Sequence, residues 1–238
     1  MKAFYLSILA ACSLHLSAAD LNLSGRSAAD IKRDTTSFPA ATLALLPLKP
    51  GQTVLDLFGG DGYYSELAAQ LVGPNGKVML HNNQAYLKYV GEALPERLKG
   101  GRLANVVRYD READQLELKP QSLEVVLFVM GYHDFYHKSA GWEVSRDVVL
   151  NQLKAALKPG GALLVVDHQA QAGSGHSAAQ DLHRIEQQLV IDELSKAGFV
   201  LQKQSDVLKN PQDDHQKPVF DPAIRGKTDR FTLVFTKP

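Results

Sequence analysis

The chain has 238 residues, of which 45% are hydrophobic and 22% are charged. This composition allows one sizeable α/β core, and it excludes both a disordered chain and one that spans a membrane throughout. Acidic and basic residues balance at 26 each, so no overall field favours nucleic acid or an anionic membrane as a partner.

The first residues have the pattern of a secretory signal peptide. Lys2 gives a short positive start, residues 3–16 are mostly apolar, and small side chains follow at residues 17–19. The run is shorter than the roughly 20 apolar residues that a membrane span needs. We therefore predict a signal peptide over residues 1–19, cleavage after Ala19, and an exported bacterial protein, periplasmic or secreted, without a membrane span.

Cys12, the only cysteine, leaves a second interpretation of this segment open. Residues 9–12 resemble the processing box of bacterial lipoproteins, and a lipid on Cys12 would anchor the mature chain to a membrane. The apolar stretch is short for such a signal, so we favour Cys12 as one more small apolar residue of the signal peptide. In either case the mature domain has no disulfide.

The rest of the chain reads as a helical lead-in followed by alternating strands and helices. Residues 20–50 are predicted to form one or two helices, and from residue 51 short apolar runs alternate with amphipathic stretches. The predicted strands are residues 53–58, 77–81, 103–109, 123–130, 162–166, 199–207 and 231–235, and the predicted helices are residues 64–71, 86–98, 144–157 and 182–194. Right-handed crossovers then give an α/β fold with a mostly parallel sheet covered by helices on both faces.

A glycine-rich turn follows the first predicted strand. It reads Asp56, Leu57, Phe58, Gly59, Gly60, Asp61, Gly62. In an open α/β sheet, ligands bind at the carboxyl ends of the strands, and glycines let the backbone approach a ligand next to a helix amino-terminus. The turn is therefore the first candidate binding site.

The same residues resemble motif I of the class I S-adenosylmethionine (SAM) dependent methyltransferases, and residues 157–164 resemble that family's loop before strand five. The resemblance covers roughly residue 53 to the end of the chain. It implies a single Rossmann-like methyltransferase domain over residues 51–238, with a mostly parallel seven-stranded sheet and an antiparallel last strand. It also implies SAM as the cofactor, with Asp56, Gly59, Gly60 and Gly62 at the amino acid end of SAM.

A narrower resemblance is to predicted exported bacterial methyltransferases. It rests on Tyr63 and Tyr64 after the glycine turn and on residues 225–231 near the end of the chain. It implies the same fold and SAM site, with Tyr63 among the cofactor contacts and with the methyl acceptor undefined.

The sequence departs from the family pattern at two positions. Phe58 stands where the family usually has its first glycine, which predicts either crowding of the methionine end of SAM or packing on the sheet. The acid that binds the ribose at the end of strand two is replaced by Asn82 or Asn83, whose amide carbonyl can accept such a bond without charge assistance. Asp110 matches the position that contacts the adenine amino group, although a solvated loop aspartate beside two arginines is an equal alternative.

Residues 131–137, after the fourth predicted strand, concentrate titratable and aromatic groups where an acceptor should bind. Methyl transfer depends mainly on positioning, and a base is needed only if the nucleophile carries a proton. We predict His133 as a general base or substrate contact, Asp134 as the residue that orients it, and Tyr132 or Tyr136 as pocket walls.

Other histidines have weaker claims to a role. His137 is expected to face water, and His168 at the end of strand five is a second crevice candidate. His183 and Arg184 lie on the amphipathic helix, where they either reach back toward the site or, as is more common, face solvent. A metal site built from His133, Asp134 and His137, with His168 and His176, matches no closed ligand spacing and lacks cysteines or a HExxH helix, so we predict no metal.

Residues 209–229 form a long polar stretch between the last two strands, which either folds over the substrate or links the final strand to the sheet. Three functions compete for the whole chain. The first is a SAM-dependent methyltransferase acting on a small molecule or an exported component. The others are a secreted, non-catalytic binding module with the same fold, and an NAD(P)-dependent oxidoreductase, because the glycine turn is one residue from the dinucleotide fingerprint.

Overall fold

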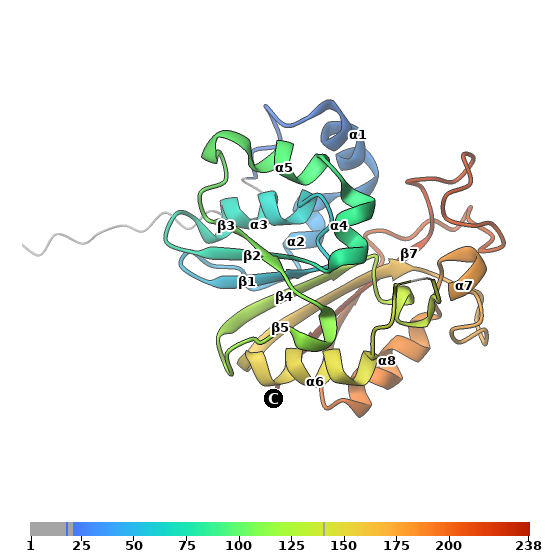
Figure 1. The fold of residues 1–238 in the computed structure, drawn as a ribbon. Coiled ribbons are helices and arrows are strands. Elements are labelled where there is room, and N and C mark those ends of the chain that lie inside the picture. Colours follow the sequence, from blue (N-terminus) through green and yellow to red (C-terminus); the bar gives the residue numbers. More distant parts are fainter. Residues whose placement is uncertain (1–17, 19–20, 140) are drawn as a thin grey trace, which may run out of the picture.

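The computed structural model describes residue 18, residues 21–139 and residues 141–238. The predicted signal peptide and Cys12 therefore lie, apart from Ala18, outside the described residues. Figure 1 shows a central sheet with helices above and below it. Among the helices of the described part, none is long and apolar enough to cross a membrane.

The sheet has seven strands in the order β3-β2-β1-β4-β5-β7-β6. All neighbouring strands pair in parallel except β7, which is antiparallel to both β5 and β6. The strands are β1 Thr53–Leu57, β2 Lys77–Asn82, β3 Val106–Asp110, β4 Leu123–Val129, β5 Leu157–His168, β6 Val200–Ser205 and β7 Arg230–Thr236. The predicted seven-stranded Rossmann-like fold with its antiparallel last strand is confirmed.

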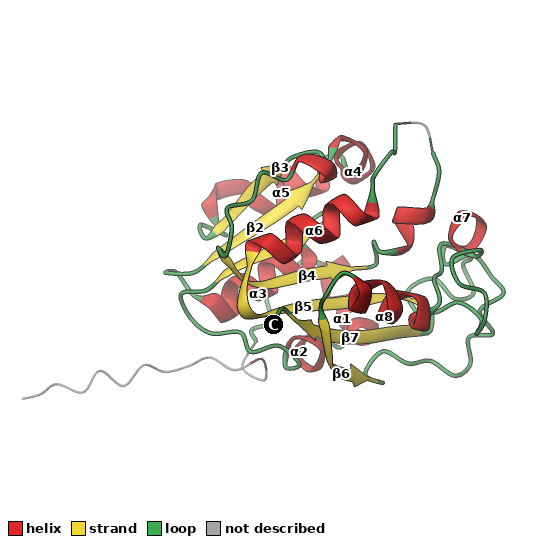
Figure 2. Ribbon diagram, turned by 90° about the horizontal axis from the view of Figure 1, so that it is seen from below, coloured by secondary structure: helices red, strands yellow, loops and turns green. Residues whose placement is uncertain are grey.

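Two hydrophobic clusters cover the two faces of this sheet. Figure 2 shows helices lying over the strands. The helices are α1 Ala28–Ser37, α2 Pro39–Leu43, α3 Tyr63–Val72, α4 Gln84–Val90, α5 Ala93–Leu98, α6 Arg146–Ala156, α7 Ala179–Leu182 and α8 Gln187–Lys196. Helices α2, α3 and α5 pack against one side of the central strands, and α6 and α8 against the other. Consecutive residues of β1, such as Val54 and Leu55, point to opposite clusters, as expected for a strand buried on both faces.

Two predicted helices are in fact interrupted. The stretch 86–98 is split into α4 and α5 because Gly91 has φ 55° and ψ −132°, a conformation that ends a helix. The stretch 182–194 is split by His183, whose φ is 52°, and α8 begins only at Gln187. Both predictions of a continuous helix were wrong, because the spacing of hydrophobic residues does not show that a single residue has a positive φ.

The segment between β6 and β7 contains turns and no further strand. It is tied to the domain by Arg184, whose guanidinium pairs with Asp213 at 2.9 Å, with both side chains fully buried. The expected solvated position of Arg184 was therefore wrong. At the end of the segment, Arg230 donates to the carbonyl of Thr36 at 2.5 Å, so β7 contacts α1 across 194 positions of sequence.

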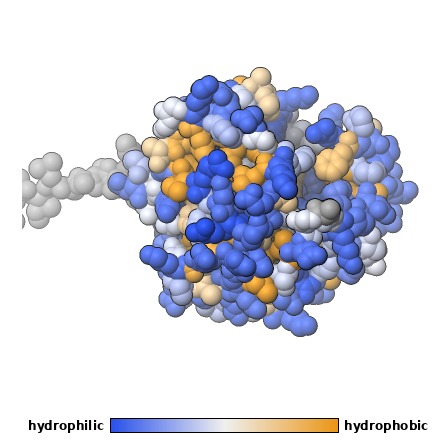
Figure 3. All heavy atoms as spheres, in the orientation of Figure 1, coloured by the Kyte–Doolittle hydropathy of each residue, from blue (hydrophilic) through white to orange (hydrophobic). Residues whose placement is uncertain are grey.

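Figure 3 shows one face of the molecule, where hydrophobic residues gather in patches broken by hydrophilic ones. The large exposed hydrophobic side chains of the described residues are scattered, and they include Ile31, Phe38, Tyr89 and Phe220. Single exposed apolar residues are normal on a soluble surface, but Tyr89 and Phe220 lie at the mouth of a cavity described below.

Candidate functional site

The glycine turn between β1 and α3 is fixed by Asp56. The Asp56 side chain is buried, and its Oδ2 accepts a hydrogen bond from Ser65 Oγ at 2.6 Å. A Cβ on Gly59 would lie 2.7 Å from the same Oδ2, so only glycine fits beside this carboxylate. At Gly62, with φ 88°, a Cβ would meet Leu80 Cδ1 at 2.6 Å, so the turn and α3 sit close to the sheet.

Burial raises the pKa of Asp56 to about 6, and the hydrogen bond from Ser65 opposes this shift only in part. The ionised carboxylate is therefore less stable in the free protein than it would be in water. A cationic group of a ligand placed beside the turn would favour the ionised form, as the ammonium of an amino acid moiety does.

Asn82 at the end of β2 is bound to the turn through both of its side-chain groups. Gly60 N donates to Asn82 Oδ1 at 3.0 Å, and Asn82 Nδ2 donates to Gly60 O at 2.9 Å. Asn83 caps α4 by accepting a bond from Tyr86 N. A carboxylate at position 82 would have no N–H group to donate to Gly60 O, so the turn itself explains the amide. The contact of Asn82 with a ribose stays a prediction.

Asp110 lies next to Asn82 across the β2–β3 pairing. Its Oδ2 accepts from Arg108 at 2.5 Å, whereas its Oδ1 is buried and has no hydrogen-bond partner among the described residues. Buried polar atoms are nearly always bonded, so this oxygen is available for a ligand donor such as an adenine amino group. The glycine cradle and the free Oδ1 fit the two ends of SAM at one edge of the sheet.

Tyr63 and Phe58 flank the turn on its two sides. The Tyr63 hydroxyl donates to Asp34 at 2.5 Å, and the Arg33 guanidinium lies 4.0 Å from the ring centroid, so Tyr63 fastens α1 to α3. Its contact with SAM stays a prediction. Phe58 is buried at φ 51°, and its ring packs on Tyr86 at 4.8 Å, which answers the question of Phe58 in favour of packing on the sheet.

A cavity of about 340 Å³ opens next to this aromatic pair, at the carboxyl ends of β4 and β5. It is lined by Ala85, Tyr86, Tyr89, Met130, His133, Asp134, His137, Ser139, Trp142, His168, His183, Val219 and Phe220. Val219 and Phe220 belong to the long segment before β7, so part of that segment covers the cavity. This favours the prediction that the segment folds over the substrate.

His133 is held between two carboxylates in the wall of the cavity. Its Nδ1 lies 2.7 Å from Asp167 Oδ1, and its Nε2 lies 3.3 Å from Asp134 Oδ1. Asp167 is fully buried at the end of β5 and also accepts bonds from the backbone N–H groups of His133 and His168. Asp167 is thus the residue that orients His133, a role that the sequence assigned to Asp134.

Burial alone lowers the pKa of His133, but Asp167 and then Asp134 outweigh it and raise the pKa to about 9. His133 is therefore a cation at neutral pH in the free protein, and it keeps the pKa of Asp167 below its ordinary value. As a general base it first has to lose this proton.

The remaining histidines differ in their surroundings. His168 Nδ1 lies 2.7 Å from Thr228 Oγ1, and burial lowers the pKa of His168 to about 3. The rings of His137 and His183 lie 4.5 Å apart, and His137 Nδ1 is buried without a partner among the described residues. His176 stacks on Tyr136 at 4.4 Å and does not line the cavity.

Tyr136 turns toward α8 instead of the cavity. Its hydroxyl hydrogen-bonds to Glu193 and Arg146, as part of a charged cluster between the turn after β4 and α8. Tyr132 also donates to Glu193, at 2.8 Å. The role of Tyr136 at the reacting atoms stays a prediction. In the structure its hydroxyl links the turn after β4 to α6 and α8.

The sequence did not single out the cavity residues Tyr86, Trp142 and Phe220, nor Asp167, which is buried behind the wall as the partner of His133. Tyr86 is the most informative, because its hydroxyl donates to Asp134 Oδ2 at 2.6 Å while its ring packs on Phe58. An aromatic residue in the first turn after Asn83 was a usable signal. The distant residues Phe220 and Trp142 gave none, since only the fold brings them here.

No protein-family model matches the chain. In sequence it is similar to the ubiquinone/menaquinone biosynthesis C-methyltransferase UbiE of Pseudomonas paraeruginosa, with 30% identity over 142 residues that cover 60% of this chain and 52% of the relative. The chain thus spans about half the length of the curated relatives it matches.

Two solved structures extend the comparison to most of the chain. A SAM dependent methyltransferase from Aquifex aeolicus has a TM-score of 0.65 at 20% identity and covers 87% of this chain and 93% of its own. Phosphoethanolamine N-methyltransferase 2 of Haemonchus contortus, in complex with SAM, has a TM-score of 0.59 at 17% identity, with 84% of this chain and 52% of its own covered. Together the comparisons support SAM as the cofactor. The fold of this chain is that of the class I SAM-dependent methyltransferases, and its similarity to curated methyltransferases supports its placement in that family.

Proposed function

We propose that the protein is a SAM-dependent methyltransferase that methylates a small molecule bound in the cavity at the ends of β4 and β5. The observation that carries this proposal is the shared wall between the two sites. Phe58 directly precedes the glycine turn, and its ring packs on Tyr86, which lines the cavity. A cofactor over the turn and an acceptor in the cavity would therefore be neighbours, as an in-line transfer requires.

When bound, SAM supplies an electrophilic methyl group on a cationic sulfur. The chain's own residues bind and orient SAM. Asp56 favours a cationic group beside the turn, Asp110 Oδ1 accepts a hydrogen bond, and the ring faces of Tyr86 and Trp142 attract a nearby positive charge.

For the acceptor we propose an aromatic small molecule. The rings of Tyr86, Trp142 and Phe220 supply stacking surfaces around the cavity, and the curated relative is named for quinone biosynthesis. The histidines beside these rings suit an acceptor that carries oxygen substituents.

Calorimetric titration of SAM, S-adenosylhomocysteine and NAD into the purified protein tests the function. We expect saturable binding of SAM and its product, at least tenfold weaker in Asp56→Ala and unchanged in Asp206→Ala, whose side chain is 87% exposed. Binding of NAD instead of SAM would favour the oxidoreductase, and binding of neither would favour the non-catalytic module.

Export is a further part of the proposal, supported by the signal pattern of residues 1–19. We expect mass spectrometry of protein recovered from the periplasm or the medium of a bacterial host to find Asp20 as the first residue. A chain that begins with lipid-modified Cys12 would point to a lipoprotein, and an intact Met1 would contradict processing.

A further inference from the structure

The cavity wall holds a group of side chains that methyl transfer by itself does not require. We propose that His133, Asp134 and His183 bind a divalent transition-metal ion of the Zn²⁺ type, with free coordination positions facing the cavity. The role of this metal in catalysis, to hold an oxygen of the acceptor, rests on the proposed function; the binding site itself does not.

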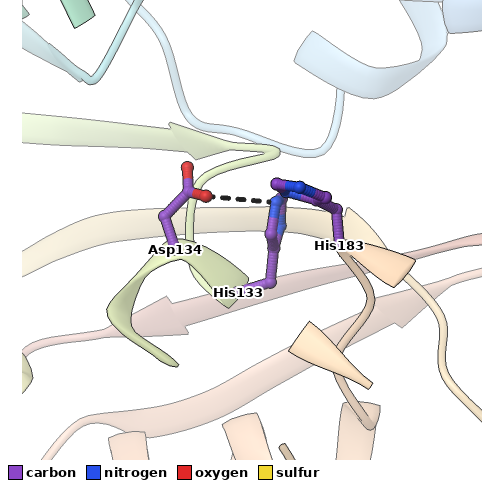
Figure 4. A group of neighbouring side chains, drawn as sticks. All are labelled: His133, Asp134 and His183. Atoms are coloured by element: carbon purple, nitrogen blue, oxygen red, sulfur yellow. Dashed lines mark ion pairs between the residues drawn. The ribbon is translucent and has the colours of Figure 1, made fainter. Parts of the chain in front are cut away.

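The ligand atoms of the three side chains lie close to one another. Each offers one ligand atom, and these atoms all lie within 4.8 Å of one another. Ligands about 2.1 Å from one tetrahedral metal are roughly 3.4 Å apart, and His133 Nε2 lies 3.3 Å from Asp134 Oδ1. Figure 4 shows the three side chains turned toward one another, with His183 arriving from a different element. Small rotations of His183 would complete the set.

The surrounding residues fix the ligands as they do in known metal sites, where a ligating histidine donates its other N–H to a carboxylate. Asp167 occupies that position, since its Oδ1 lies 2.7 Å from His133 Nδ1. This bond leaves Nε2 as the nitrogen that binds the metal, which displaces its proton. Tyr86 in turn donates to Asp134 Oδ2 at 2.6 Å, which leaves Oδ1 facing the histidines.

The third ligand comes from a strained position. His183 has φ 52° between α7 and α8, a conformation that costs a non-glycine residue about 1 kcal/mol or more and persists mainly at functional sites. Beside it lies the ring of His137, whose buried Nδ1 has no partner among the described residues. Two imidazoles and one carboxylate form the mixed N/O ligand set of open, catalytic metal sites.

Titration of Co²⁺ and Zn²⁺ into tag-free protein that has been stripped with a chelator tests the site. We expect one Co²⁺ per chain, with visible absorption bands that Zn²⁺ displaces. Asparagine tolerates positive φ, so the His183→Asn variant should stay folded. We expect His183→Asn and Asp134→Asn each to weaken Co²⁺ binding at least tenfold.

His176→Ala is the matched control, because His176 stacks on Tyr136 outside the cavity. It should bind Co²⁺ as the parent protein does. Absence of stoichiometric binding, unchanged affinity in His183→Asn, or an equal loss in His176→Ala would each overturn the site. The outcome is separate from the SAM titration, because Co²⁺ binding is measured without SAM and SAM binding without metal.

Discussion

Asp56 is a buried acid whose ionised form destabilises the fold. Its pKa is raised to about 6 by burial, so the folded state holds the proton more tightly than the unfolded chain does. The resulting stability is fully present below pH 3.8, falls as the pH rises, and is lost above pH 6. At neutral pH the buried carboxylate costs the fold up to about 3 kcal/mol.

Replacing Asp56 with asparagine should remove that cost. We expect Asp56→Asn to raise the free energy of unfolding by about 1–3 kcal/mol at pH 7.5 and by much less at pH 4, while SAM binding weakens. Urea unfolding at the two pH values measures the difference, with Asp206→Asn as an exposed control. An equal gain at both pH values would show that the carboxylate's charge is not the cause.

Asn82 tests whether the missing family carboxylate can be restored. Asn82→Asp keeps the acceptor for Gly60 N but loses the donor to Gly60 O, which leaves a part-buried carbonyl facing a carboxylate. We expect a loss of about 1–3 kcal/mol of stability at pH 7.5 in thermal unfolding, and no gain in SAM affinity. Tighter SAM binding by the variant would instead place the side chain on the ribose.

At this scale the sequence predicts which residues lie near the site better than it predicts what they do. His133, Asp134 and His168 do line the cavity, because the ends of parallel strands share one edge of the sheet. Their partners depend on side-chain rotamers and on distant segments. Asp167 rather than Asp134 holds His133 Nδ1, and His183 reaches the cavity only through its positive φ.

Among the elements, the break between α4 and α5 depends on a single glycine. Gly91 has φ 55° and ψ −132°, and a Cβ added there would meet no atom within 4 Å, so backbone strain alone opposes a side chain. We expect Gly91→Ala to lower the free energy of unfolding by about 1–3 kcal/mol in urea titrations. Glu92→Ala, one residue later at φ −75°, should change it by less than about 0.5 kcal/mol. Similar values for both variants would contradict the strain.

The strands were predictable and the helix boundaries less so. Buried strands are continuous apolar runs, so β1, predicted at residues 53–58 and observed as Thr53–Leu57, shows plainly in the sequence. The extra length of β5, which begins at Leu157, comes from a bulged pairing with β4 that no periodicity records. The family resemblance implied a mostly parallel seven-stranded sheet with an antiparallel last strand. The order of the strands was not predicted, since local patterns do not encode which strands are neighbours.

For the whole molecule, Arg97 joins α1 to α3 and to the glycine turn. Its guanidinium lies 2.9 Å from Asp30 in α1, 2.6 Å from Glu66 in α3 and 2.8 Å from Asp61 in the turn. Burial would raise the pKa values of Asp30 and Glu66, but bonds to arginines, among them Arg97, outweigh it and lower both.

Removing Arg97 takes away the arginine that Asp30 and Glu66 share at hydrogen-bond distance. We expect Arg97→Ala to cost about 3–5 kcal/mol at pH 7.5, and less as the pH falls through the range where Asp30 and Glu66 bind protons. Thermal unfolding against pH measures this, and Arg102→Ala, which removes a half-exposed partner of Glu66, should cost less. A loss independent of pH would contradict the electrostatic reason.

The contact between Arg230 and Thr36 has a consequence for the order in which the protein is made. It joins the first helix to a strand that is inserted between β5 and β6 only after β6 has been made, across 194 positions of sequence. Pairings so distant in sequence form late in folding. The sheet therefore cannot be completed until β7 has been made, so the growing chain lacks its full core until then.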